Sequence, residues 1–204
     1  MLKKIEVDAR IKVKNLADLI EAPIVIRLKK FNEESTDKFS EELSKAHETG
    51  QPIIPIVVDS YGGQVYSLLG MISEIQNCLL PVATIVESKA MSAGAILFGL
   101  GNDGLRFMTP HATLMLHEVS SFQFGKVEDL KADVDETDRL NTYIFDLLDK
   151  SCGQSKNYFL DLIHEEHGHA DWYMTAKEAK KHNLCNQIRL PRFNVKVSVD
   201  YKFE

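Results

Sequence analysis

The chain has 204 residues, a hydrophobic fraction of 44% and a net charge of −6 at pH 7. This length predicts one domain with a substantial core, and the acidic charge disfavours nucleic acid as a partner. Three scattered cysteines, Cys78, Cys152 and Cys185, predict no disulfide framework and indicate a reducing compartment. Residues 1–15 are too charged for a signal peptide, and no apolar run approaches the roughly 20 residues that cross a bilayer. We therefore expect a soluble intracellular protein without a membrane partner.

The first half of the chain alternates between predicted strands and predicted helices. Apolar, largely β-branched runs predict strands over residues 23–28, 52–59 and 81–88. Amphipathic or apolar segments predict helices over residues 32–50, 64–78 and 93–101. Asn32 is the expected N-cap of the first helix, and Pro55 suggests an edge or irregular position for its strand. This order predicts an α/β fold of βαβ units with a mainly parallel sheet.

The second half begins with a further predicted strand and then becomes mainly helical. Residues 112–119 predict a strand, and residues 125–153 predict one long amphipathic helix. A shorter helix is expected over residues 154–166. The segment 175–183 opens with a predicted capping box from Thr175 to Glu178. Strict alternation of apolar and polar residues at 194–203 predicts a strand with one solvent-exposed face.

Ser92 lies among small residues in the stretch SKAMSAGAILFG, where a predicted strand gives way to a predicted helix. This placement is similar to that of a nucleophile elbow, with Ala90 in place of the first glycine. Small neighbours would let a substrate carbonyl reach the hydroxyl, and the helix N-terminus offers free N–H groups. The alternative is a serine at a tight contact between helix and sheet.

Two more stretches bear on the chemistry of Ser92. DSYGG follows a strand, and Gly62 and Gly63 would let backbone N–H groups face a ligand closely. An ordinary turn is the alternative for this pair. His117 interrupts an apolar strand, where it is either a core residue or the base that takes a proton from the serine.

Taken together, VVDSYGG, SKAMSAGAILFGLGNDGLRFMTPHATLMLHEV, GQS and DWYMTAKEAKKHNL resemble the signature blocks of the Clp protease proteolytic subunit (ClpP) family. The similarity runs from about residue 23 to residue 188. The resemblance implies that Ser92 is the nucleophile, His117 the general base and Asp171 the acid that orients it. It also implies an oxyanion hole formed by the N–H groups of Gly63 and Ala93.

The same resemblance implies the architecture and the partners. The fold would be a ClpP/crotonase-like superhelix of ββα and βαβ units with a protruding handle helix. Residues 1–204 would form one domain, with an N-terminal axial segment at 1–22, a protease core at 23–190 and a C-terminal extension at 191–204. The family implies two stacked heptameric rings.

The activity implied is that of an ATP-dependent serine endopeptidase, with polypeptide substrates fed into the ring by an AAA+ unfoldase. No cofactor, metal or nucleic acid is expected. The expected location is the cytoplasm, an organelle stroma or matrix, or the host cytoplasm if a virus encodes the chain.

Several positions depart from the family pattern. Tyr61 stands where the family has a proline before Gly-Gly. Phe122 and Phe124 replace a glycine-rich stretch of the handle, and Ala170 replaces an arginine used between rings. The insertion HEEHGH at 164–169 could bind zinc, but the spacing of His164 and His167 is three rather than four, so we expect a solvated helix end.

Three other functions are alternatives. A catalytically silent ring subunit is the main alternative, and retention of all three triad positions disfavours it. A crotonase-type acyl-CoA enzyme would not need Ser92, His117 and Asp171 together. A serine–lysine peptidase could use Lys89, but no membrane segment accompanies it.

Overall fold

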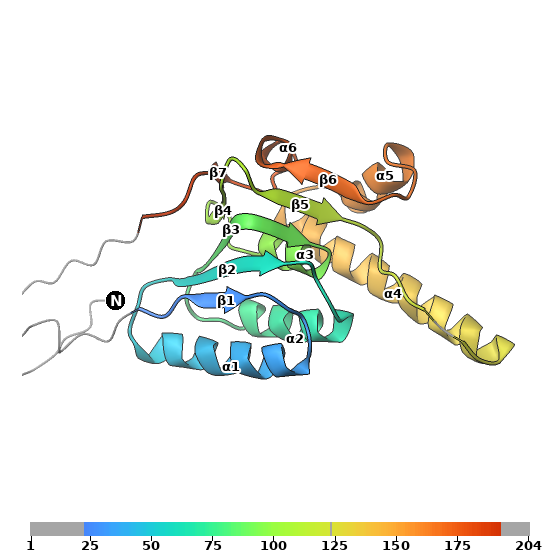
Figure 1. Cartoon of the computed structure of the whole chain (residues 1–204), viewed down its shortest axis with the longest axis horizontal. Coiled ribbons are helices and arrows are strands. Elements are labelled where there is room, and N and C mark those ends of the chain that lie inside the picture. The colour runs from blue at the N-terminus through green and yellow to red at the C-terminus, as the bar shows by residue number, and fades with distance from the viewer. Residues whose placement is uncertain (1–22, 123, 193–204) are drawn as a thin grey trace, which may run out of the picture.

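A mostly parallel sheet organises the computed structural model, which describes residues 23–122 and 124–192 (Figure 1). Within these residues the strands are β1 (Ile26–Leu28), β2 (Ile54–Ser60), β3 (Val82–Met91), β4 (Arg106–Met108), β5 (Thr113–Leu116), β6 (Trp172–Thr175) and β7 (Gln187–Ile188). The helices are α1 (Glu33–Glu48), α2 (Val65–Gln76), α3 (Ala93–Gly99), α4 (Val127–Ser151), α5 (Tyr158–Glu165) and α6 (Ala176–Lys181). The expected axial segment at 1–22 and the expected strand at 194–203 lie outside the described residues.

The sheet has the order β1-β2-β3-β4-β7, with parallel pairing throughout this path. The long strand β3 pairs with β4 through its first half and with β5 through its second half. Strand β6 then adds to β5 in the antiparallel sense. The expectation of a mainly parallel α/β sheet is therefore confirmed, and β5 and β6 bring two distant parts of the chain beside the end of β3.

Helix α1 forms as its sequence predicts. Asn32 caps it in a reciprocal box, because its side chain accepts from the Ser35 N–H and the Ser35 hydroxyl accepts from the Asn32 N–H. Phe39, Leu43 and Ala46 form the buried face of the helix. Burial of this stripe, together with the cap, fixes α1 against the sheet.

The edge position suggested by Pro55 is wrong. Strand β2 lies inside the sheet, between β1 and β3, and Pro55 pairs in register with Ala83. The pairing with β1 starts only at Ile56, so Pro55 has no paired residue on that strand. Its missing N–H is therefore tolerated in an interior strand.

The capping box expected at the start of α6 forms only in part. The Thr175 hydroxyl accepts from the Glu178 N–H, as expected for an N-cap. The Glu178 carboxylate accepts instead from the Trp172 indole N–H at 3.1 Å. Glu178 therefore ties α6 to β6 rather than to its own N-cap.

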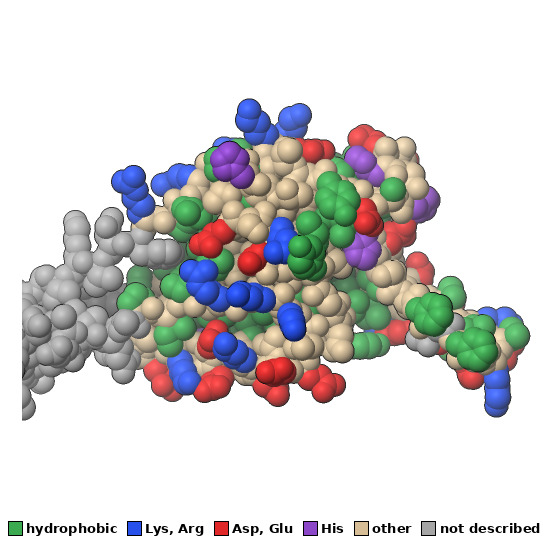
Figure 2. Space-filling view, in the orientation of Figure 1, with side chains coloured by type: hydrophobic (Ala, Val, Ile, Leu, Met, Phe, Trp, Pro, Cys, Tyr) green, Lys and Arg blue, Asp and Glu red, His purple; other side chains and the backbone are tan. Residues whose placement is uncertain are grey.

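Helix α4 packs on the core through its C-terminal half only, where Ile144, Phe145 and Leu148 are buried. Its N-terminal half extends beyond the rest of the molecule (Figure 1), and Val127 and Val134 are each 66% exposed. Figure 2 shows hydrophobic side chains beside charged ones at this projecting end. No helix in the described part of the chain is both long and apolar enough to span a bilayer.

Candidate active site

Ser92 occupies the single residue between the end of β3 and the start of α3. Its φ of 54° and ψ of −126° are rarely adopted by a residue with a side chain. The Ser92 N–H donates to the Met115 carbonyl at 2.8 Å, and its carbonyl accepts from Ala95 and Ile96. Its side chain does not cap the helix. The backbone is thus firmly held while the hydroxyl stays available, as in a nucleophile elbow.

The turn after β2 approaches Ser92 closely. A Cβ on Gly62 would lie 2.7 Å from the Ser92 Cβ and 3.1 Å from its Oγ. A Cβ on Gly63 would lie 2.4 Å from the Phe31 carbonyl oxygen. Both glycines also have positive φ, of 102° and 153°. Only glycine fits at either position, and this brings the backbone of the turn against Ser92.

Polar contacts hold the same turn in place. The Ser60 hydroxyl accepts from the Gly62 N–H at 3.0 Å. Lys89 Nζ binds Asp59 Oδ1 at 2.7 Å and lies 4.5 Å from the centre of the Tyr61 ring. Tyr61 therefore covers the ion pair that braces this turn.

Lys89 is also unsuited to act as the base for Ser92. Its hydrogen bond with Asp59 raises the pKa of the lysine above its usual value. A lysine that stays protonated cannot take a proton from a serine. This contact argues against the serine–lysine alternative.

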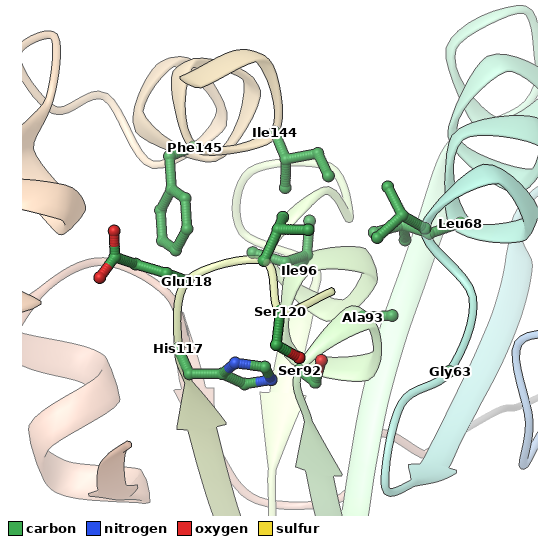
Figure 3. A pocket seen from close by; sticks show the side chains of 12 residues that line it. Gly63, Leu68, Ser92, Ala93, Ile96, His117, Glu118, Ser120, Ile144 and Phe145 are labelled. Carbon is green, nitrogen blue, oxygen red and sulfur yellow. The ribbon is translucent and has the colours of Figure 1, made fainter. Parts of the chain in front are cut away.

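His117 directly follows β5 and shares a pocket with Ser92. Figure 3 shows the His117 ring pointing toward Ser92, while Glu118 points away from it. The pocket is a cavity of about 60 Å³. Its apolar wall comes from α2, α3 and α4, through Leu68, Ile96, Ile144 and Phe145.

Asp171 lies at the same edge of the sheet. Strands β5 and β6 pair in the register Leu116↔Trp172, so one further step sets Asp171 opposite His117. The Asp171 side chain is exposed. Among the described residues, no hydrogen bond joins Ser92 to His117 or His117 to Asp171. The fold thus brings the three residues to neighbouring strand ends without engaging their side chains.

Two backbone N–H groups face this region without internal partners. In the described part of the chain, neither the Gly63 N–H nor the Ala93 N–H donates a hydrogen bond. Ala93 is the first residue of α3, where an N–H has no partner within the helix. Gly63 lies in the turn that presses against Ser92. These two groups are available to a carbonyl oxygen in the pocket.

Glu118, a half-buried carboxylate beside His117, was not predicted from the sequence. Glu118 Oε1 binds His164 Nε2 and Glu118 Oε2 binds His169 Nδ1, both at 3.0 Å. Burial acts to raise the pKa of Glu118, but the two histidine contacts outweigh burial and lower it. The overlooked signal was a charged residue at the end of an otherwise apolar strand.

Comparison of the sequence with known proteins matches it to one family. A family model described as Clp protease matches residues 8–191. The chain belongs to the Clp protease family. One relative, the ATP-dependent Clp protease proteolytic subunit 1 of Chlamydia abortus, is 31% identical over 182 residues, which cover 85% of this chain and 92% of the relative. A protein of the same name from Salinibacter ruber is 29% identical over 140 residues, which cover 69% of this chain and 58% of that relative.

Membership in the Clp protease family supports a peptidase activity for the ClpP-like chain. The mostly parallel sheet and the six helices of the described residues are consistent with this membership.

Proposed function

We propose that the chain is a serine endopeptidase in which Ser92 is the nucleophile, His117 the general base and Asp171 the residue that orients His117. One observation carries this proposal. Ser92 sits in a strained turn with a free hydroxyl, and the His117 ring of the neighbouring strand points at it. All three triad positions are retained, which disfavours the catalytically silent ring subunit.

The proposed reaction follows the general scheme of a serine triad. Ser92 Oγ attacks the carbonyl carbon of the scissile peptide bond while His117 takes the serine proton. The oxyanion that forms is stabilised by the N–H groups of Gly63 and Ala93. His117 then gives its proton to the leaving amine, and a water molecule hydrolyses the acyl-enzyme by the reverse sequence of proton transfers.

The exposed Asp171 supports a role for assembly in this mechanism. Its carboxylate lies opposite His117 in register but is not bonded to it in the single chain. We expect contacts between subunits to bring the Asp171 carboxylate onto the imidazole. Catalysis would then be confined to the assembled protein.

The proposed assembly is a heptameric ring, with two rings stacked through α4 as handle helix. Its chamber would receive unfolded polypeptide from an ATP-dependent AAA+ unfoldase, and the apolar wall of the pocket would accept an apolar side chain of the substrate. The proposed location is the cytoplasm, an organelle stroma or matrix, or the cytoplasm of a host. No cofactor is needed for this chemistry.

The test is the substitution Asp171→Asn in the assembled protein, with hydrolysis of a short fluorogenic peptide as the measurement. Loss of the orienting carboxylate should lower turnover by about 10⁴-fold, because the imidazole then adopts the wrong tautomer. Glu165→Gln is the matched control, since Glu165 is an exposed acid in the same segment. Normal turnover in Asp171→Asn, with a large loss in Glu165→Gln, would overturn the assignment.

A further inference from the structure

Two histidines of the insertion at 164–169 meet a carboxylate from a distant part of the chain. His164 is in the last turn of α5, His169 lies in the connection to β6, and Glu118 follows β5. The candidate ligand atoms of these three residues all lie within 4.8 Å of one another. The spacing of His164 and His167 along the sequence disfavours zinc. The fold pairs His164 with His169 instead.

The backbone folds back sharply to make this meeting possible. Gly168 and His169 have φ of 60° and 63°, so two successive residues are left-handed, and the second is not a glycine. The His169 N–H returns to the Ile163 carbonyl at 2.9 Å. The ring of His169 then stacks on that of His164, with 4.2 Å between their centres. The strained residue thus presents its imidazole next to another imidazole.

The carboxylate is oriented by a buried amide. Asn141 of α4 accepts from the Val119 N–H through its oxygen at 3.1 Å, which turns its nitrogen toward Glu118 Oε1 at 3.3 Å. Asn141 is 7% exposed. A carboxylate ligand held by such a neighbouring hydrogen bond is a common feature of metal sites.

His167 does not belong to this cluster. Its ring stacks on Trp172, with 4.7 Å between the ring centres. Of the three histidines of the insertion, His167 therefore packs on Trp172, and only His164 and His169 face Glu118.

We infer that Glu118, His164 and His169 form a binding site for a divalent transition metal ion of the zinc class. Two imidazoles and one carboxylate are a ligand set that Zn²⁺ prefers, with a fourth position left for water. Bond lengths of about 2.0–2.2 Å in a tetrahedron need ligand atoms about 3.3–3.5 Å apart. The two histidine–carboxylate distances of 3.0 Å are close to this spacing.

The site is also open to an ion from solvent. The side chains of His164 and His169 are 37% and 62% exposed, so small ring rotations can complete the geometry without disturbing the core. A bound ion would join the segment that follows His117 to the segment that precedes Asp171. The metal would thus hold the end of β5 next to the start of β6, the strand with which it pairs.

The experiment is a calorimetric titration of the full, untagged chain with Zn²⁺ alone, repeated with Co²⁺ to record its visible absorption. The wild type should bind one ion per chain and give the spectrum of tetrahedral cobalt. His164→Ala and His169→Ala should each weaken zinc binding by about tenfold or more. His167→Ala is the matched control, and its zinc affinity should equal that of the wild type.

A further variant distinguishes the loss of a metal ligand from the loss of the fold. Glu118→Gln keeps a hydrogen-bonding side chain for both histidines but removes the charge, so its unfolding midpoint should stay near the wild-type value while zinc binding falls. Cys78 Sγ and His47 Nε2, 3.4 Å apart, are a competing pair of ligands elsewhere in the molecule. The proposal is overturned if the wild type binds no zinc, or if His164→Ala and His169→Ala bind it as tightly as the wild type.

Discussion

Ser92 has a backbone conformation that costs an ordinary residue about 1–3 kcal/mol. The conformation persists because its neighbours fix it. The Ser92 N–H is bonded to β5, its carbonyl begins α3, and Gly62 blocks one side of the residue. The strain sets the hydroxyl at the edge of the sheet instead of against the helix N-terminus. This local strain therefore positions the hydroxyl that acts in the proposed reaction.

At the residue scale we predict that Gly62→Ala abolishes peptide hydrolysis. The new methyl group would overlap the Ser92 side chain, and the positive φ adds a destabilisation of more than about 1 kcal/mol. Peptide turnover and the urea midpoint of unfolding are the two measurements. Turnover should fall far more than the loss of stability explains.

Gly104→Ala is the matched control for this prediction. Gly104 has a φ of 80°, but a Cβ there would meet nothing within 4 Å. Both variants should lose stability, and only Gly62→Ala should lose activity. Equal activity in the two variants would show that the contact between Gly62 and Ser92 has no functional consequence.

The residues of the proposed active site and of the proposed metal site differ in how readily the sequence predicts them. Ser92, Gly63 and His117 stand at the ends of strands that local pattern predicts, and parallel strand ends meet at one edge of a sheet. Asp171 was predicted from a motif, because β6, the strand that directly follows it, has only four residues and no clear pattern of its own. The cluster of Glu118 with His164 and His169 depends on a backbone reversal at residues 168–169, which spacing along the chain does not reveal.

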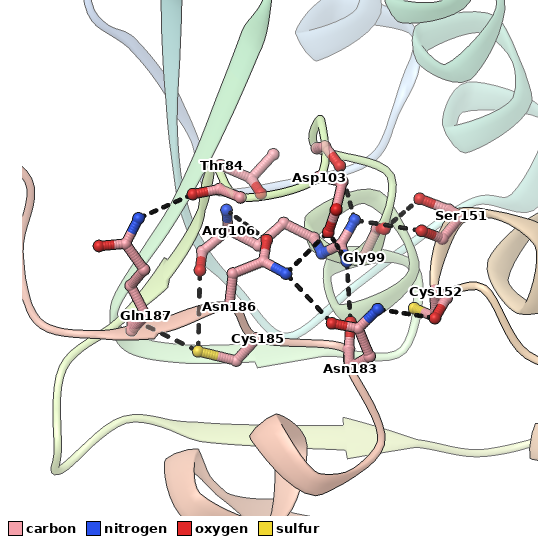
Figure 4. A network of polar contacts seen from close by, with 12 residues as sticks. Thr84, Gly99, Asp103, Arg106, Ser151, Cys152, Asn183, Cys185, Asn186 and Gln187 are labelled. Atoms are coloured by element: carbon pink, nitrogen blue, oxygen red, sulfur yellow. Dashed lines mark hydrogen bonds and ion pairs between the residues drawn. The ribbon is translucent and has the colours of Figure 1, made fainter.

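At the element scale, β4 and β7, which like β6 were not predicted from the sequence, are held by a buried arginine (Figure 4). Arg106 is 0% exposed, and its guanidinium donates to the carbonyls of Gly101, Ser151 and Asn183. These contacts join the sheet to the end of α4 and to the segment after α6. These strands have only three and two residues, and the first of them begins with an arginine, so both lack the apolar run by which buried strands are recognised.

His182, the C-cap of α6, leads to a prediction about pH. It accepts or donates a hydrogen bond with the Tyr158 hydroxyl at 2.8 Å and meets the Trp172 ring edge-on. Burial lowers the pKa of His182 below its usual value. The unfolded chain therefore takes up the proton first, and stability is lost as the pH falls below about 6.5.

The substitution His182→Asn should remove part of this pH dependence, because asparagine offers a similar acceptor to Tyr158 and does not titrate. Urea midpoints at about pH 7.5 and about pH 5.5 measure the effect. The drop in midpoint between the two pH values should be smaller in His182→Asn than in the wild type. His111→Asn, at an exposed position, is the control. An unchanged drop in His182→Asn would contradict the prediction.

At the scale of the whole molecule, the projecting half of α4 and the segment before it leave apolar side chains uncovered. Phe122 and Phe124 are 95% and 98% exposed, and Val134 of α4 is 66% exposed. Exposed apolar side chains gathered in this way are typical of a surface that binds a partner. The proposed stacking of two rings through α4 would cover them.

We predict that the native protein is a ring of seven 23.1-kDa chains, or a stack of two such rings. Val134→Glu should shift the native mass from the stack to the single ring, because a charge would then be buried between handles. Val134→Thr, which keeps the volume without adding charge, should shift it far less. Native mass spectrometry measures both. A wild type that stays monomeric or dimeric under all conditions would contradict the proposed assembly.

The proposed nucleophile is the central claim, and a fluorophosphonate tests it most directly. The assembled protein is treated with the probe, digested, and analysed by mass spectrometry to locate the adduct. We predict a single adduct on Ser92, and its loss in His117→Ala, because the hydroxyl then lacks the base that activates it. An adduct on Ser120, the other serine of the pocket, or equal labelling of Ser92 in wild type and His117→Ala, would contradict the account.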